Sequence, residues 1–197
     1  MKRRIALSLM LISLALLQAV PFMDGEKLNF HVKYGLIKAA EATLEAQTAD
    51  YQGSAVWQLS TNAKTFPFFD KVFKVRDRVE SWWDKDTLLP HKFAKNLQEG
   101  KYRQHRVHIY NHALGSSSYQ KWDFKKNRFD SSEMDIPNDT QDILSAFYAV
   151  RNSELTVGKP VVINVVADGR FMRTEVKVHR KEMIKTIFGE TECLVIE

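Results

Sequence analysis

Cysteine is nearly absent from this chain of 197 residues, which contains only Cys193. A single cysteine cannot form an internal disulfide, and it excludes a zinc site built on cysteine pairs. Cys193 lies in an apolar run near the end of the sequence, where we expect inert packing in a strand and no reactive thiol.

Glycine-rich loops and nucleophile motifs are absent as well. The sequence has no P-loop, no dinucleotide-binding fingerprint and no Gly-x-Ser-x-Gly, so it carries none of the usual phosphate cradles or serine elbows. The serines at positions 116–118 follow Gly115 in a turn between two expected strands. We therefore predict a protein without a cofactor that is not an enzyme.

A hydrophobic run long enough to cross a bilayer is also missing. Residues 5–19 form a short apolar stretch that follows three basic residues at positions 2–4 and precedes Pro21. A spanning helix needs about 20 apolar residues, and proline ends a helix. The pattern is that of a secretory signal peptide, residues 1–19, cleaved after Ala19. We expect export through the general secretory pathway to the periplasm, with no stable membrane span after cleavage.

Charge of one sign is not in large excess. The formal net charge is +5, and removal of the three basic residues of the signal leaves +2 for residues 20–197. So small a charge gives no electrostatic case for a nucleic-acid partner.

An alternation with a period of two residues dominates the rest of the sequence. Residues 27–34 place Leu28, Phe30, Val32 and Tyr34 on one face, which is typical of a strand with one solvated side. The same period recurs in residues 41–47, 57–62, 71–84, 92–99, 102–110, 117–124 and 172–178. Residues 160–167 form a nearly continuous Val/Ile run, and residues 182–196 form a last hairpin. The sequence predicts one antiparallel β domain over residues 20–197.

The period changes once, near residue 140. Asp139 is a candidate N-cap for a helix from about Thr140 to Val150. Its apolar stripe, with the spacing of a helix, predicts that Phe147 and Tyr148 pack on the sheet.

Residues 141–151 and 155–158 resemble the hallmark segment of the exported bacterial proteins called domain of unknown function 3108. Residues 25–28, 32–35 and 39–44 resemble the first hairpin of that family, and residues 75–81 and 89–90 its middle. The resemblance implies a strongly curved antiparallel sheet or open half-barrel with one packed helix, similar to those of envelope lipoproteins and lipid carriers. It implies no activity. Members usually run on past the position where this chain stops, which leaves open that the chain is truncated at its C-terminus.

Metal sites are not favoured by the sequence. His105, His108 and His112 lie on an expected strand, where His105 points away from the other two, so we expect histidines that face solvent. The acidic residues Asp135, Asp139 and Asp142 lack the glycine and the glutamate of a calcium loop.

One acidic residue, Asp77, shares a face with Val75 and Val79. An aspartate on an apolar face needs a partner, and we expect an arginine to pair with it.

Aromatic residues near Pro67 are the best candidates for a binding site. They are Phe66, Phe68, Phe69, Trp82 and Trp83. Consecutive tryptophans on a strand cannot both point inward, so one lies on an outer face or a rim. An exposed aromatic patch marks a contact surface, although ordinary core packing is an alternative.

Two functions remain. The first hypothesis is a periplasmic protein that binds an apolar or amphiphilic ligand, such as a lipid, in a groove of its sheet and serves envelope maintenance. The alternative is an interaction module that docks its aromatic loop or sheet edge onto an envelope protein without a small-molecule ligand.

Overall fold

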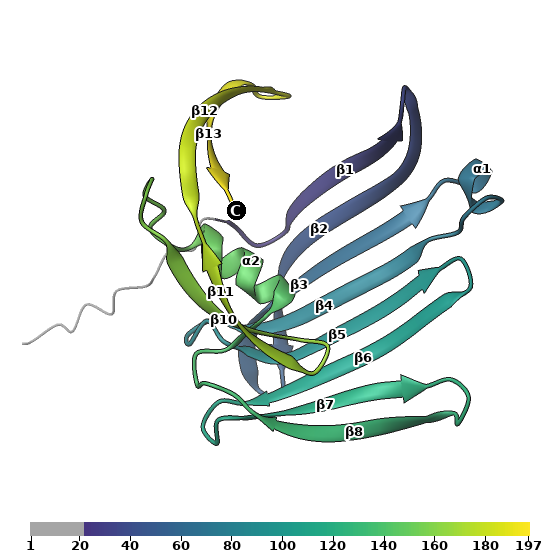
Figure 1. The fold of residues 1–197 in the computed structure, drawn as a ribbon, viewed down its shortest axis with the longest axis vertical. Helices are drawn as coiled ribbons and strands as arrows, with labels where there is room; N and C mark the ends of the chain where they lie inside the picture. The colour runs from purple at the N-terminus through teal and green to yellow at the C-terminus, as the bar shows by residue number, and fades with distance from the viewer. Residues whose placement is uncertain (1–21) are drawn as a thin grey trace, which may run out of the picture.

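Residues 22–197 are described by the computed structural model (Figure 1). The predicted signal peptide, residues 1–19, lies outside the described residues. The first eight strands are β1 (Glu26–Tyr34), β2 (Ile37–Tyr51), β3 (Ser54–Thr65), β4 (Arg76–Asp84), β5 (Pro90–Glu99), β6 (Tyr102–Asn111), β7 (Ser116–Asp123) and β8 (Arg128–Asp135). A single helical turn, α1 (Pro67–Asp70), connects β3 to β4.

These strands form one antiparallel sheet in which each strand pairs with its sequence neighbours. The order β1 to β8 is a meander whose two edges are β1 and β8, so the sheet is open. The alternation of apolar residues correctly predicted a mainly β fold. It did not reveal β8, because nearly every side chain of that strand is exposed.

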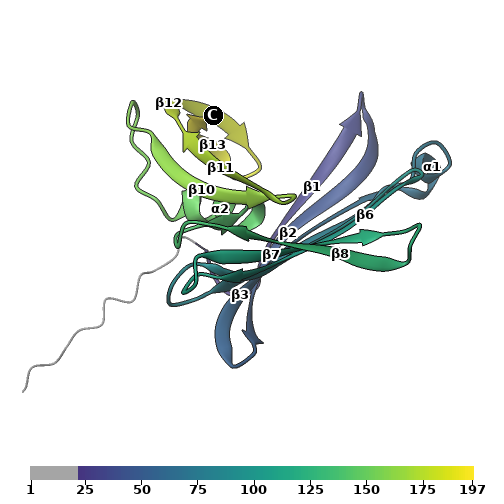
Figure 2. The same cartoon turned by 60° about the horizontal axis from the view of Figure 1, so that its bottom comes forward.

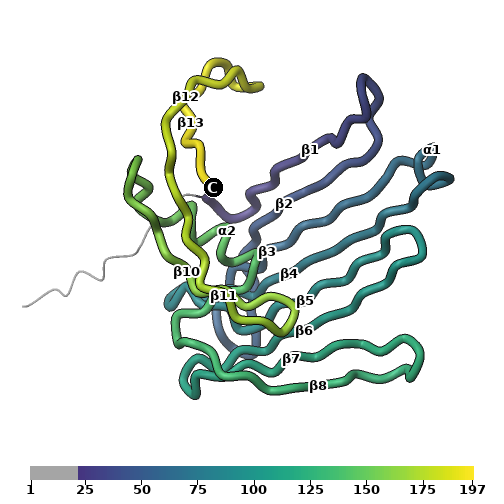
Figure 3. Tube along the Cα trace, in the orientation of Figure 1, coloured from purple at the N-terminus to yellow at the C-terminus, as the bar shows by residue number. Residues whose placement is uncertain are grey.

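The remainder of the chain lies near one end of this sheet, where α2 and the short strand β9 pack against it (Figure 2). It contains β9 (Gln141–Asp142), α2 (Ile143–Arg151), β10 (Val161–Ala167), β11 (Arg170–Val176), β12 (Val178–Thr186) and β13 (Gly189–Ile196). Strands β9, β10 and β11 form a small sheet, and β12 and β13 form a separate hairpin. The trace of Figure 3 shows α2 and the β10–β11 hairpin near one end of the large sheet, with α1 at the other.

The helix begins three residues later than the sequence predicted. Asp142, and not Asp139, is its N-cap, and its carboxylate accepts hydrogen bonds from the amides of Leu144 and Ser145. The chain stays extended up to Asp142 because residues 141–142 pair with β10. Asp139 instead accepts a hydrogen bond from the side-chain amide of Asn164.

The core lies between α2 and the large sheet. Its largest fully buried side chains are Trp83, Tyr148, Phe93 and Leu59. Tyr148 is core, as predicted, but Phe147 is not, since half of its surface is exposed. Phe147 lies in the middle of α2, between the buried Leu144 and Tyr148, but on a side of the helix that the rest of the chain covers only in part.

Candidate functional site

Pairing across the large sheet aligns one residue from each strand in rows. We call the face that carries α2 the inner face, because Leu59 and Phe93 point from it into the core with Leu144 of α2. One row of this face, the covered row, contains Ala46, Leu59, Ser81, Phe93, His108 and Tyr119. Its first five members are buried, so this row lies beneath the helix and the β10–β11 hairpin.

The neighbouring row, two residues along each strand, lies where this cover ends. This boundary row contains Leu28, Leu44, Thr61, Val79, Lys95, Arg106, Lys121 and Asp130, in strand order from β1 to β8. Its first four side chains are apolar apart from one threonine, and the next three are cationic. The row therefore changes from apolar to basic in the middle of the sheet.

An apolar groove of about 260 Å³ opens at the β1–β3 end of the boundary row. It is lined by Phe30, Ala42, Thr43, Leu44, Thr61, Leu144 and Phe147. Phe30 of β1 and Phe147 of α2 are each about half exposed and form its most exposed aromatic surface. The groove exists because α2 covers the sheet only in part, and it presents apolar surface that folding leaves in contact with water.

Three cations occupy the other end of the boundary row. In the register of β5, β6 and β7, Lys95 lies directly opposite Arg106, and Arg106 lies directly opposite Lys121. Lys95 forms an ion pair of 2.7 Å with Asp168, and Arg106 donates a 2.6 Å hydrogen bond to the hydroxyl of Tyr119. Like charges directly opposite each other destabilise a sheet. Asp168, and Asp130 opposite Lys121, offset part of this cost, and an anionic ligand would offset more of it.

His108 is the buried histidine beside these cations. The amide of Gly169 donates to its Nε2 at 3.2 Å, so the proton of the neutral ring lies on Nδ1, which donates to Ser117 Oγ at 3.1 Å. Burial lowers the pKa of His108 to about 4. A base for serine needs its lone pair toward the hydroxyl. The pair therefore holds the turn of the β10–β11 hairpin on the sheet and does not activate Ser117.

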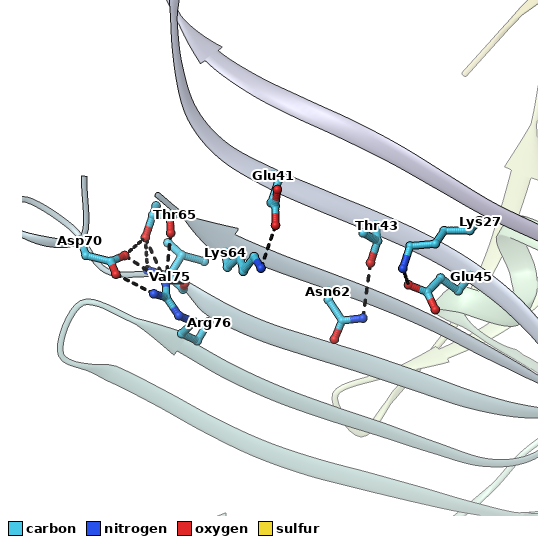
Figure 4. Close-up of polar contacts among 10 residues, drawn as sticks. All are labelled: Lys27, Glu41, Thr43, Glu45, Asn62, Lys64, Thr65, Asp70, Val75 and Arg76. Atoms are coloured by element: carbon cyan, nitrogen blue, oxygen red, sulfur yellow. Dashed lines mark hydrogen bonds and ion pairs between the residues drawn. The ribbon is translucent and has the colours of Figure 1, made fainter. Parts of the chain in front are cut away.

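The opposite face of β1–β3 is hollowed and polar. Its side chains pair across the strands, with ion pairs of 2.8 Å for Lys27–Glu45 and for Lys64–Glu41 (Figure 4). Such mutual pairing is typical of a solvated structural face, so the apolar groove is the better candidate for a binding site.

Comparison with protein families gives one match. The model of the family described as "Protein of unknown function (DUF3108)" matches residues 29–197, which is most of the chain. The chain belongs to this family. No curated protein and no solved structure matches it.

The five aromatic residues predicted from the sequence do not form one site in this DUF3108 chain. Trp83 is a core residue with no exposed surface, and its indole N–H donates to the backbone oxygen of Leu88 and to Gln141. Trp83 therefore presents no surface to solvent in this structure. Trp82 points to the opposite face, where it contacts Tyr51 and lies beneath Lys92.

Phe66, Phe68 and Phe69 lie at α1, at the end of the sheet remote from α2. Phe68 has 71% of its surface exposed, whereas Phe66 and Phe69 are half-buried. Arg76 holds this turn in place through Asp70 at 2.6 Å, and the hydrogen bonds from Arg76 lower the pKa of that carboxyl (Figure 4). These residues belong to a rim and not to the groove.

Two further expectations are corrected in this DUF3108 chain. His108 is fully buried and does not face solvent, since the β10–β11 hairpin covers it. Asp77 pairs with no arginine among residues 22–197 but accepts a hydrogen bond from the backbone amide of Gln98 at 2.9 Å.

Within residues 22–197, no group of three or more acidic, histidine or cysteine side chains is arranged to hold a metal ion. No helix in that range has the length and apolarity to span a membrane.

Proposed function

We propose that this chain is an exported, periplasmic, non-enzymatic protein that binds an anionic amphiphile on the inner face of an open half-barrel. The apolar tail lies in the groove between β1–β3 and α2, and the headgroup lies near Lys95, Arg106 and Lys121. The single observation that carries the proposal is the boundary row, in which apolar and cationic side chains follow one another across neighbouring strands.

The dimensions of the row suit such a ligand. Neighbouring strands are separated by roughly 4.8 Å, so Leu44 and Lys95, which lie three strands apart in the row, are separated by roughly 14 Å. A medium acyl chain spans this distance. The signal-like N-terminus supports a role in the envelope, where such amphiphiles are abundant.

The test is a titration with a fluorescent fatty acid such as dansyl-undecanoate. We expect saturable binding with a blue shift of emission, and Phe147→Ser is expected to weaken it about tenfold, because the substitution removes apolar contact worth roughly 1.4 kcal/mol. The melting temperature should hardly change, since Phe147 is half exposed.

A matched control is Phe129→Ser, which changes a partly exposed phenylalanine of β8 that packs against Trp122. This variant should bind the probe like the unmodified protein. Lys121→Glu should weaken binding of the carboxylate probe but leave binding of the uncharged amide derivative of the same probe unchanged. Equal losses of probe affinity in Phe147→Ser and Phe129→Ser would refute the proposal that the groove binds the ligand. So would a lack of saturable binding in the unmodified protein.

The sheet edge supports the interaction module as a second candidate. β1 is an edge strand whose Phe30, Val32 and Tyr34 are at least half exposed. An edge of this kind can accept a strand from a protein partner. Saturable binding of the fatty acid would favour the amphiphile-binding proposal over this interaction module.

A further inference from the structure

The turns at one end of the large sheet share an unusual composition. In a meander, alternate turns lie at the same end, and Figures 1 and 2 show the β1–β2, β3–β4, β5–β6 and β7–β8 connections together at the end remote from α2. We call residues 33–38, 66–75, 99–103 and 123–128 the rim.

Each turn of the rim exposes large apolar or aromatic side chains. Leu36 is 99% exposed and Phe68 is 71% exposed. The full set is Tyr34, Leu36, Ile37, Phe68, Val72, Phe73, Tyr102 and Phe124, each at least half exposed. The ring of Phe73 lies over Gly100 and that of Phe68 contacts Phe69, but packing within the chain still leaves at least half of each of these eight side chains exposed.

Basic residues alternate with these apolar side chains. The rim contains the exposed cations Lys33, Lys38, Lys71, Lys74, Lys101, Arg103, Lys125, Lys126 and Arg128, against the acids Asp70, Glu99 and Asp123. Two of these acids are already paired within the chain, Asp70 with Arg76 and Asp123 with Lys126. Asp130, just outside the rim, also pairs with Lys126 and Arg128, and the remaining cations leave the rim with an excess of positive charge.

The turns at the opposite end of the sheet provide the contrast. Residues 50–54, 84–90 and 111–116 contain one basic residue, Lys85, and three acids. Leu114 is the one large apolar side chain in these three turns that is exposed. The two ends of one meander thus differ in both charge and apolar exposure, although both consist of short turns.

We propose that the rim docks on the surface of an anionic phospholipid bilayer. Lysines and arginines bind the negative headgroups, and aromatic side chains enter the interfacial layer beside them. The apolar residues occupy separate protruding tips and not one flat patch, which suits insertion between headgroups better than burial against a protein. Docking does not require a ligand in the groove, so the two proposals can fail independently.

The test places an environment-sensitive thiol probe at the rim of the full chain. In a Cys193→Ser background, Phe68→Cys and Phe124→Cys are labelled, and Leu114→Cys at the opposite end is the control. We expect a blue shift of both rim probes with vesicles of phosphatidylglycerol and phosphatidylcholine, and no shift at position 114. Because the probe reports its own surroundings, contact of residues 1–21 with the vesicles does not produce the rim signal.

A charge reversal tests the electrostatic part. Lys71→Glu with Lys74→Glu should weaken the vesicle response of the probe at position 124 at least about 30-fold, because each basic side chain near an anionic surface strengthens binding roughly fivefold. Lys159→Glu with Lys177→Glu makes the same change of charge outside the rim and should alter it less than about threefold.

Three results would overturn the proposal. They are an absence of shift at positions 68 and 124, an equal shift at position 114, and an equal response to pure phosphatidylcholine. Capture of a protein by the rim without a vesicle response would assign the surface to that protein instead.

Discussion

Replacement of Asp142 by alanine is expected to lower the free energy of unfolding by about 3 kcal/mol at neutral pH. The carboxylate accepts hydrogen bonds from Ser81 Oγ at 2.6 Å and from the amides of Leu144 and Ser145 at 2.8 Å each. Alanine would remove the N-cap of α2 and leave three donors in the core without this acceptor. A buried donor without a partner costs roughly 1–3 kcal/mol.

Asp142→Asn is the matched control. Burial raises the pKa of Asp142 to about 6, so at pH 7 the ionised carboxylate is less favourable in the folded state than in the unfolded state. Asparagine keeps an acceptor oxygen for the helix amides without the charge, and we expect a loss below about 1 kcal/mol. Urea unfolding of both variants measures the difference. Equal losses would show that the charge, and not the hydrogen bonds, gives Asp142 its role.

Acidification should destabilise the fold by protonating His108, which holds the β10–β11 hairpin on the sheet. The pKa of this ring falls from 6.5 to about 4 on folding, because burial disfavours its charged form; Asp168 opposes the shift and Lys95 adds to it. The unfolded chain therefore binds the proton more readily, and stability is lost as the pH falls from 6.5 toward 4. The loss at pH 4 should be about 3 kcal/mol. Protonation of Nε2 would also place an N–H donor opposite the N–H of Gly169, so the hydrogen bond between them would be lost.

Asp142 titrates in the same range with the opposite sign, since its raised pKa favours the folded state at low pH. The measurement is therefore made in the Asp142→Asn background, with and without His108→Gln. The glutamine cannot titrate, so the difference in unfolding free energy between the two proteins should shift by about 3 kcal/mol between pH 7 and pH 4. A difference that does not vary with pH would show that His108 is not the group that titrates.

The sequence predicted the local structure well because its signals are local. Alternation of apolar residues along β1 to β7 is visible without tertiary contacts, and so is the stripe of Leu144 and Tyr148 in α2. β8 was missed for the same reason, because both of its faces are solvated and no alternation develops.

The site was harder to predict because it depends on contacts between distant elements. The row of Lys95, Arg106 and Lys121 depends on the register of three strands. The exposure of Phe147 depends on which side of α2 faces the sheet, and this is set by tertiary packing. Alternation required one of Trp82 and Trp83 to point inward, but the burial of Trp83 also depends on Gln141, which lies 58 residues away.

The central claim is that an amphiphile lies along the boundary row, and photolabelling tests it most directly. A fatty acid with a diazirine at its terminal carbon is bound to the full chain, irradiated and located by peptide mass spectrometry. The predicted labels fall on the groove, at Phe30, Ala42, Leu44, Leu144 or Phe147, and an excess of unlabelled fatty acid should remove them. Labels that resist this competition, or that fall mainly on the opposite face around Tyr51 and Trp82, would contradict the claim.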